Sequence, residues 1–170
     1  SSSSSGTSTF PAFDDFEDNS LSEYSGDTSL FTPVTSPVYG RTYALGSNPT
    51  SGKTTDGIFR FDQTVAQGQM IRYMQYVNAG TGGNNDEPCT LFGVQSPGTT
   101  NQNYGVCLER FGVDRLSLAK NVQNNDTSGT VLATTTVTYS TGWYEVEVDW
   151  RTTNQIVVSL YTAAGSFVAS

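Results

Sequence analysis

Three carboxylates alternate along one short segment of the chain, at Glu145, Glu147 and Asp149. Hydrolysis of a glycosidic bond needs two carboxyl groups that converge on one sugar, one of them kept protonated by burial or by an anionic neighbour. Alternate residues of a β-strand lie about 6.6–6.8 Å apart, which neither establishes nor excludes such a pair. Polar side chains alternating with apolar ones are also typical of any half-exposed strand. We therefore expect a solvated strand face without catalytic residues.

A second group of carboxylates lies near the N-terminus, where six of the 16 acidic residues fall between positions 14 and 27. Calcium prefers a cage of oxygen ligands, which carboxylates on a strand end and its loop supply. The sequence thus predicts one structural calcium ion held by Asp15, Glu17 and Asp18. A solvated acidic edge is the alternative interpretation of these residues. Segment 84–87 is a further acidic loop, which a simple turn explains as well as a ligand site does.

The charge balance and the lack of histidine exclude several functions. The chain has 16 acidic and 8 scattered basic residues, a net charge of −8. Binding to a phosphate backbone needs a clustered basic surface, so we expect no nucleic-acid partner. Without histidine there is no Ser-His-Asp or Cys-His pair and no imidazole ligand for zinc. No apolar run approaches the roughly 20 residues of a membrane-spanning helix, so we expect no membrane insertion.

The two cysteines flank a turn-rich segment. Cys89 and Cys107 lie symmetrically about Gly98, so a hairpin centred there would place them opposite each other on neighbouring strands. A disulfide across this loop would stabilise the fold by roughly 3 kcal/mol. Two buried free thiols are the alternative. A disulfide, together with the glycosylation sequon at Asn125, indicates an oxidising extracellular environment such as a cell surface or virion surface.

The rest of the chain supplies the strands that must position these residues. Apolar and polar residues alternate with a period of two, and no stretch of eleven or more shows a helical period. The segments are 38–45, 57–62, 69–77, 89–95, 104–111, 114–119, 130–139, 143–150 and 155–161. Short strands with hairpin-length gaps favour antiparallel pairing, and a sheet this large buries one face by packing on a second sheet. We predict an all-β, antiparallel two-sheet sandwich with a core face formed by Tyr144, Val146, Val148, Trp150, Ile156, Val158 and Leu160.

The chain divides into two regions by composition. Residues 1–9 are rich in Ser, Thr and Gly, which is typical of a flexible tether. Residues 10–170 are long enough to bury a single core and are expected to form the sandwich. Because the chain starts without Met and stops within an apparent strand, we expect it to be a piece of a longer polypeptide.

Four segments resemble a known family. They read FDDFEDNSLSEY at 13–24, LFGV at 91–94, LSL at 116–118 and GWYEVEVDW at 142–150. Together they resemble a laminin-G-like domain of the concanavalin A-like lectin/glucanase superfamily, over most of residues 13–168. The similarity is greatest to copies in surface proteins of halophilic archaea and their viruses. It implies a jelly-roll sandwich of two curved sheets that binds carbohydrate or protein, with a further core strand after Ser170, so that the sandwich would be truncated at its C-terminus.

The resemblance also bears on activity and on the binding site. Glucanases of that superfamily carry Glu-x-Asp-x-x-Glu or Glu-x-Asp-x-Glu, whereas this chain has a different order at 145–149, so we expect no enzymatic activity. Sugar binding by such sandwiches uses an exposed aromatic ring beside amides and carboxylates. Our candidates are Tyr24, Tyr39, Asn84, Asn101, Tyr104 and Trp143. Closing the ends of the sandwich is an alternative role for Tyr39 and Trp143.

Two classes of function remain. The first is a non-catalytic carbohydrate-binding or adhesion module, whose partner is a glycan or a surface glycoprotein. The second is a fibre, turret or decoration subunit that contacts identical subunits or other proteins of an assembly. Glucanase activity ranks third. An exposed aromatic groove on a monomer would favour the first class, and an extensive repeated interface would favour the second.

Overall fold

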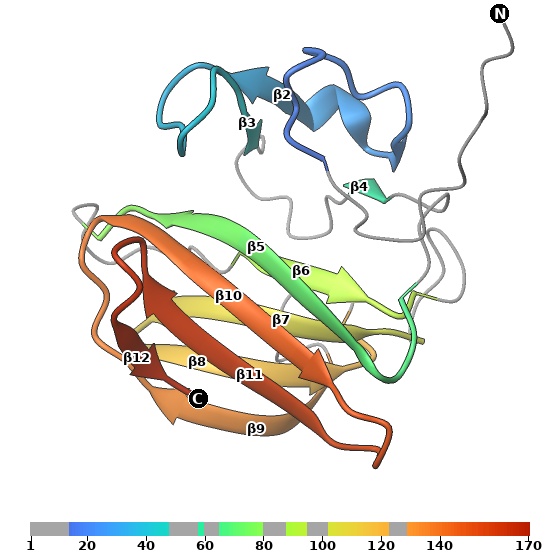
Figure 1. Cartoon of the computed structure of the whole chain (residues 1–170), viewed down its shortest axis with the longest axis vertical. Coiled ribbons are helices and arrows are strands. Elements are labelled where there is room, and N and C mark those ends of the chain that lie inside the picture. The colour runs from blue at the N-terminus through green and yellow to red at the C-terminus, as the bar shows by residue number, and fades with distance from the viewer. Residues whose placement is uncertain (1–13, 48–57, 60–64, 80–87, 95–101, 123–128) are drawn as a thin grey trace, which may run out of the picture.

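The computed structural model describes residues 14–47, 58–59, 65–79, 88–94, 102–122 and 129–170. Two four-stranded antiparallel sheets dominate this part of the chain and pack face to face (Figure 1). The predicted all-β, two-sheet sandwich is therefore confirmed. The predicted tether, residues 1–9, lies outside the described residues. Within those residues, no helix has the length and apolar character needed to span a membrane.

One sheet has the order β12-β11-β10-β5. Its strands are β5 (Gln69–Val77), β10 (Gly142–Trp150), β11 (Ile156–Thr162) and β12 (Phe167–Ala169). In the middle of β10, Val146 lies opposite Tyr73 of β5 and Leu160 of β11. This register places Val146 and Leu160 fully inside the core, and it turns Glu145 and Glu147 to the outer face.

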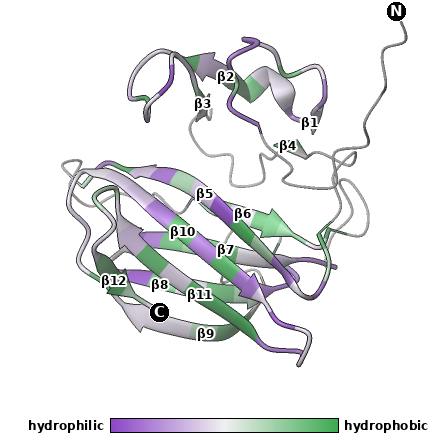
Figure 2. Cartoon of the chain, viewed as in Figure 1, coloured by the Kyte–Doolittle hydropathy of each residue, from purple (hydrophilic) through white to green (hydrophobic). Residues whose placement is uncertain are grey.

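The other sheet has the order β6-β7-β8-β9. Its strands are β6 (Cys89–Phe92), β7 (Tyr104–Phe111), β8 (Val113–Lys120) and β9 (Thr130–Thr136). Val106 and Leu108 of β7, with Leu116 and Leu118 of β8, face the first sheet. Figure 2 shows hydrophobic and hydrophilic residues alternating along the strands, as this packing requires. Burial of each such aliphatic side chain contributes about 1.5–3 kcal/mol, so the two inner faces are the main source of stability.

The core face predicted from the sequence is confirmed. Five of its seven residues are buried, namely Tyr144, Val146, Val148, Val158 and Leu160. The other two, Trp150 and Ile156, are partly buried and pack against the core at its margin. The disulfide is confirmed as well, because Cys89 and Cys107 are paired residues of β6 and β7 and are bonded.

Two small antiparallel ribbons, separate from the two large sheets, come from the N-terminal part of the described chain (Figure 1). One joins β1 (Ser25–Gly26) to β4 (Ile58–Phe59), and the other joins β2 (Phe31–Val34) to β3 (Ala44–Ser47). A single-turn 3₁₀ helix, η1 (Thr28–Leu30), precedes β2. A Cβ atom at Gly46 would lie 2.5 Å from Val34 Cγ1, so the second ribbon needs a glycine there.

Some predicted strand boundaries were wrong for identifiable reasons. Segments 69–77 and 104–111 match β5 and β7, but the predicted strand 38–45 begins only at Ala44. Residues 39–42 form bends instead, with Gly40 at a φ of +66°. Strand β2 was missed because Pro33 interrupts the pattern, although proline is tolerated in an edge strand. Strand β12 lies in the apparent strand expected at the end of the sequence, but its bounds were not predicted because it has only three residues.

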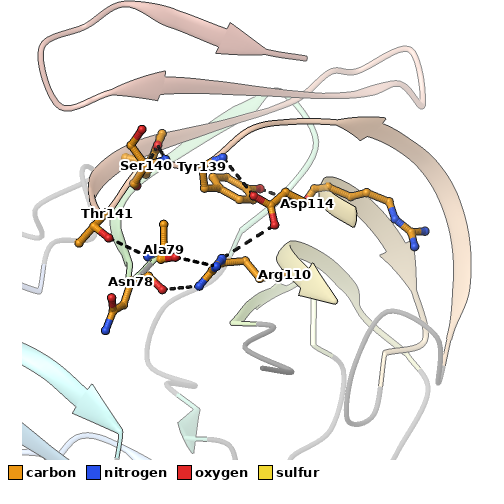
Figure 3. A network of polar contacts seen from close by, with 9 residues as sticks. Asn78, Ala79, Arg110, Asp114, Tyr139, Ser140 and Thr141 are labelled. Carbon is orange, nitrogen blue, oxygen red and sulfur yellow. Dashed lines mark hydrogen bonds and ion pairs between the residues drawn. The ribbon is translucent and has the colours of Figure 1, made fainter. Parts of the chain in front are cut away.

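A polar network closes one end of the sandwich (Figure 3). At the end of β7, the Arg110 guanidinium donates hydrogen bonds to the carbonyl oxygens of Asn78 and Ala79, which follow β5; the second measures 3.1 Å. Asp114 of β8 lies 3.9 Å from Arg110 Nε and accepts a 3.2 Å hydrogen bond from the Tyr139 N–H. The network therefore ties the end of the β6–β9 sheet to the segments that enter and leave the opposite sheet.

Candidate functional site

A pocket of about 260 Å³ opens at the other end of β7. It is formed by residues at the ends of β7, β8 and β10 and by the residue that follows β6. The described part of the lining combines two aromatic rings, three amide side chains and one ammonium group. The lining residues are Gly93, Gln102, Asn103, Tyr104, Lys120, Asn121 and Trp150.

Three aromatic rings form a cluster at this pocket, and two of them line it. Phe92 is buried and stacks on Tyr104, with ring centroids 5.6 Å apart and an interplanar angle of 23°. Trp150 meets both rings edge to face, at 5.7 Å from Phe92 and 5.6 Å from Tyr104. Such arrangements are favoured by the quadrupoles of the rings. Phe92 thus anchors the cluster in the core, while the half-buried Tyr104 and Trp150 present apolar surface to the pocket.

Gly93 allows the chain to pass close to the tryptophan. Its φ is +62°, in the left-handed region that favours glycine. A Cβ atom at this position would lie 3.3 Å from Trp150 Cη2 and 3.8 Å from Tyr104 Cδ2. Both the backbone conformation and the packing therefore require a residue without a side chain at the edge of the aromatic cluster.

The polar rim is held by one asparagine. The side-chain amide of Asn103 donates to the Val122 carbonyl at 3.0 Å and accepts from the Val122 N–H at 2.9 Å. Its backbone carbonyl accepts from the Asn121 N–H at 2.9 Å. Asn103 is thus occupied in fixing the loop after β8. The exposed side chains of Gln102 and Lys120 lie on the same rim.

The predicted sugar-binding residues Tyr39 and Trp143 meet at a different place. Their rings lie 6.0 Å apart on the outer face of the β5-β10-β11-β12 sheet, where the Tyr76 ring also meets Trp143 edge to face at 5.4 Å. The Tyr39 hydroxyl also donates to the Ala163 carbonyl at 3.4 Å. This contact joins the N-terminal segment to the sheet, a packing role that accounts for both residues. Sugar binding by this pair stays a prediction.

The other predicted sugar ligands are dispersed. The Tyr24 hydroxyl donates to Asp14 Oδ2 at 2.6 Å and its ring stacks on Phe16, so it is engaged within the N-terminal segment. Asn84 and Asn101 lie outside the described residues, as does the sequon at Asn125. Of the four candidates that the structure describes, Tyr104 alone lines the pocket.

The predicted calcium ligands accept hydrogen bonds from nearby backbone. Glu17 Oε1 accepts from the N–H groups of Thr42 and Tyr43 at 2.7 and 2.8 Å. The N–H of Tyr43, followed by the hydroxyl and N–H of Thr42 and the charge of Arg41, holds the pKa of Glu17 below its ordinary value, against a smaller opposing effect of burial. The favoured charged form is therefore used to fix the start of β3.

The other two predicted ligands are engaged in the same way. Asp15 Oδ1 accepts from the Glu17 N–H at 3.2 Å, and Asp18 Oδ1 accepts from the Ser20 N–H at 3.1 Å. Among the described residues, no three Asp, Glu or Cys side chains come together as a possible metal site. As placed, these carboxylates do not form the cage that calcium needs. Calcium binding stays a prediction.

The alternating carboxylates of β10 form ion pairs on the outer face. Arg72 Nη2 lies 2.7 Å from Glu147 Oε2, and Arg72 Nε lies 3.9 Å from Glu145 Oε1. Arg151 Nε lies 2.7 Å from Asp149 Oδ2. None of the three carboxylates lines the pocket beside Trp150.

Sequence reasoning missed most of the pocket. Trp150 was assigned to the core face because it continues the alternation of β10, and that pattern does not show that the core ends at this residue. Lys120 and Asn121 belong to no sequence motif that would mark them as binding residues. They reach the pocket only because Tyr104 and Lys120 are paired across β7 and β8.

No protein-family model, curated protein or solved structure matches the chain. These comparisons therefore assign no function to the pocket. The laminin-G-like resemblance remains an expectation from the sequence, and the function has to be argued from the chemistry of the residues themselves.

Proposed function

We propose that this protein is a non-catalytic carbohydrate-binding module. The supporting observation is the pocket in which the rings of Tyr104 and Trp150 lie beside amide and ammonium side chains. Sugars offer apolar C–H faces that pack on aromatic rings, and hydroxyl groups that exchange hydrogen bonds with amides. The volume of about 260 Å³ is just below the roughly 300–1,000 Å³ of common small-molecule pockets, which suits a single sugar unit.

The same pocket supports binding without hydrolysis. Cleavage of a glycosidic bond requires two carboxyl groups that flank the bond, and the described part of the lining includes no Asp or Glu. The alternating carboxylates of β10 are ion-paired on the outer face of the sheet. We therefore propose that bound sugar is released unchanged.

The disulfide supports an extracellular location, because such bonds persist in oxidising environments. On a cell or virion surface, several copies of a module with one small pocket could engage one glycan together. Weak binding at each pocket would then give firm attachment. We propose adhesion to a glycan or surface glycoprotein as the role of the module.

The test is retention on a panel of immobilised polysaccharides, with simultaneous measurement of released reducing ends. Two matched variants each replace one tryptophan with phenylalanine. Trp150→Phe removes about 40 Å² of apolar contact from the pocket, which at about 25 cal/mol per Å² weakens binding roughly fivefold. Trp143→Phe alters the outer face, and binding should be unchanged.

The outcomes separate the possibilities. Retention that weakens in Trp150→Phe alone, without released sugar, supports the proposal. Equal loss in both variants would mean that the pocket is not the binding site. Product release that disappears in a Glu145→Gln or Glu147→Gln variant would replace binding with catalysis.

A structural role in an assembly of identical subunits is the second candidate, and strand β9 favours it. Among the described strands β9 pairs with β8 alone, so its other edge is open. It carries no charged residue, and Val131 and Leu132 are 43% and 46% exposed. An uncharged, open edge is a template for pairing with another strand. Two copies could pair β9 antiparallel without opposing like charges, despite the net charge of −8.

The oligomeric state of the protein tests this second role. Sedimentation velocity should show dimers if β9 pairs with itself, and Val131→Lys should return them to monomers. The matched control is Val113→Lys on the inner strand β8, at a residue that is 51% exposed. A monomer at all concentrations would eliminate β9 pairing in solution.

A further inference from the structure

We infer that the pocket beside Trp150 selects a sugar acid and that Lys120 binds its carboxylate. The inference rests on the proposed carbohydrate-binding function and adds the class of sugar. It comes from the distribution of charge around the pocket.

Lys120 differs from the other cationic side chains of the described chain. This part of the protein contains five arginines and one lysine. Each arginine lies between 2.7 and 3.9 Å from a carboxylate oxygen, as seen for Arg41, Arg72, Arg110, Arg115 and Arg151. Within the same residues, the exposed ammonium of Lys120 forms no ion pair. In a protein with twice as many acids as bases, such a cation is unusual.

The register places this cation at the aromatic cluster. Lys120 is the partner of Tyr104 across β7 and β8, so both side chains point to the same face of the sheet. Trp150 lies 5.6 Å from Tyr104 and completes the lining. Among the described residues that line the pocket, there is no Asp or Glu to compete for the ammonium.

The three kinds of group match three parts of one ligand. The rings of Tyr104 and Trp150 suit the C–H face of a pyranose, and the amides of Gln102 and Asn121 suit its hydroxyls. The ammonium of Lys120 suits an anionic substituent, because a charge-assisted hydrogen bond is about twice as strong as a neutral one. A uronic acid carries such a substituent on a sugar-sized ring.

Titration calorimetry with matched pairs of methyl glycosides tests the inference. Each pair consists of a uronic acid and its neutral hexose, for the gluco, galacto and manno series, so the ligands differ only at C6. We expect at least one uronic acid to bind roughly tenfold more tightly than its hexose, as one charge-assisted hydrogen bond implies. Lys120→Gln should remove this preference, so that the uronic acid and its hexose bind with equal affinity. Arg151→Gln, which alters an exposed cation outside the pocket lining, should retain the preference.

The other results each overturn a defined statement. Equal affinity for acid and hexose, or a preference that survives Lys120→Gln, would refute selection by Lys120 while leaving carbohydrate binding intact. Retention on neutral polysaccharides with no binding of any uronic acid would have the same meaning. Failure to bind every saccharide in both formats would refute the inference and the proposed function together.

Discussion

Replacement of Arg110 by methionine should destabilise the sandwich by about 1.5–3 kcal/mol. The Arg110 side chain is 12% exposed and donates to the carbonyl oxygens of Asn78 and Ala79. A hydrogen bond from a charged donor contributes about 1.5–3 kcal/mol, which gives about 3–6 kcal/mol for the two. Water can solvate the exposed Asn78 carbonyl after the substitution, and the methionine stem retains part of the packing. Both effects reduce the net loss to about half.

Urea unfolding followed by tryptophan fluorescence measures this loss. The matched control is Arg72→Met, because Arg72 also contacts carboxylates but its side chain is 60% exposed. An exposed ion pair contributes about 0–1 kcal/mol, so the control should change the free energy of unfolding by less than 1 kcal/mol. If Arg110→Met costs no more than Arg72→Met, the network does not hold the two sheets together at this end.

Three further variants test separate parts of the fold. Replacing Cys89 and Cys107 with alanine should lower the free energy of unfolding by about 3 kcal/mol in urea titrations, from the entropy of closing a loop with an 18-residue separation; a loss below about 1 kcal/mol would contradict this. Burial, followed by nearby carboxylates, raises the pKa of Tyr139. The contribution of the neutral Tyr139 phenol to the free energy of unfolding is therefore complete below about pH 10, and it is lost as pH rises through the folded-state pKa. Tyr139→Phe should reduce the decline in melting temperature at alkaline pH, and an unchanged decline would contradict this explanation. Gly105→Ala should cost about 1–3 kcal/mol by thermal unfolding, because its Cβ would lie 2.9 Å from Val122 Cγ2; a neutral result would show that the Val122 loop yields freely.

The sequence predicts most of the sandwich because alternation carries the information about faces. A shift of one residue in β10 would exchange the buried Val146 for Glu145, so the pattern allows a single register. The spacing of Cys89 and Cys107 about Gly98 likewise defines the β6–β7 pairing. The bounds of short strands such as β12 cannot be predicted in this way, because three residues do not establish a period.

The pocket was less predictable because it depends on contacts between strand ends. Tyr104 was recognised as an exposed aromatic, but its neighbours Trp150 and Lys120 come from different strands. Which strand ends meet is decided by sheet order and by packing between the sheets, and neither follows from local alternation. For the same reason, the sequence does not show that the rings of Tyr39 and Trp143 meet, because they come from distant segments of the chain.

Ligand-induced fluorescence from a single tryptophan tests most directly whether sugar binds at this end of the sandwich. The chain contains two tryptophans, so Trp143→Phe leaves Trp150 as the sole reporter, and Trp150→Phe leaves Trp143. Each variant is titrated with the polysaccharide that retains the native protein best, after circular dichroism has shown that it is folded. We predict a saturable change in emission from Trp150 and none from Trp143. A response from Trp143 alone, or saturable binding with no response from Trp150, would contradict a carbohydrate site at the pocket.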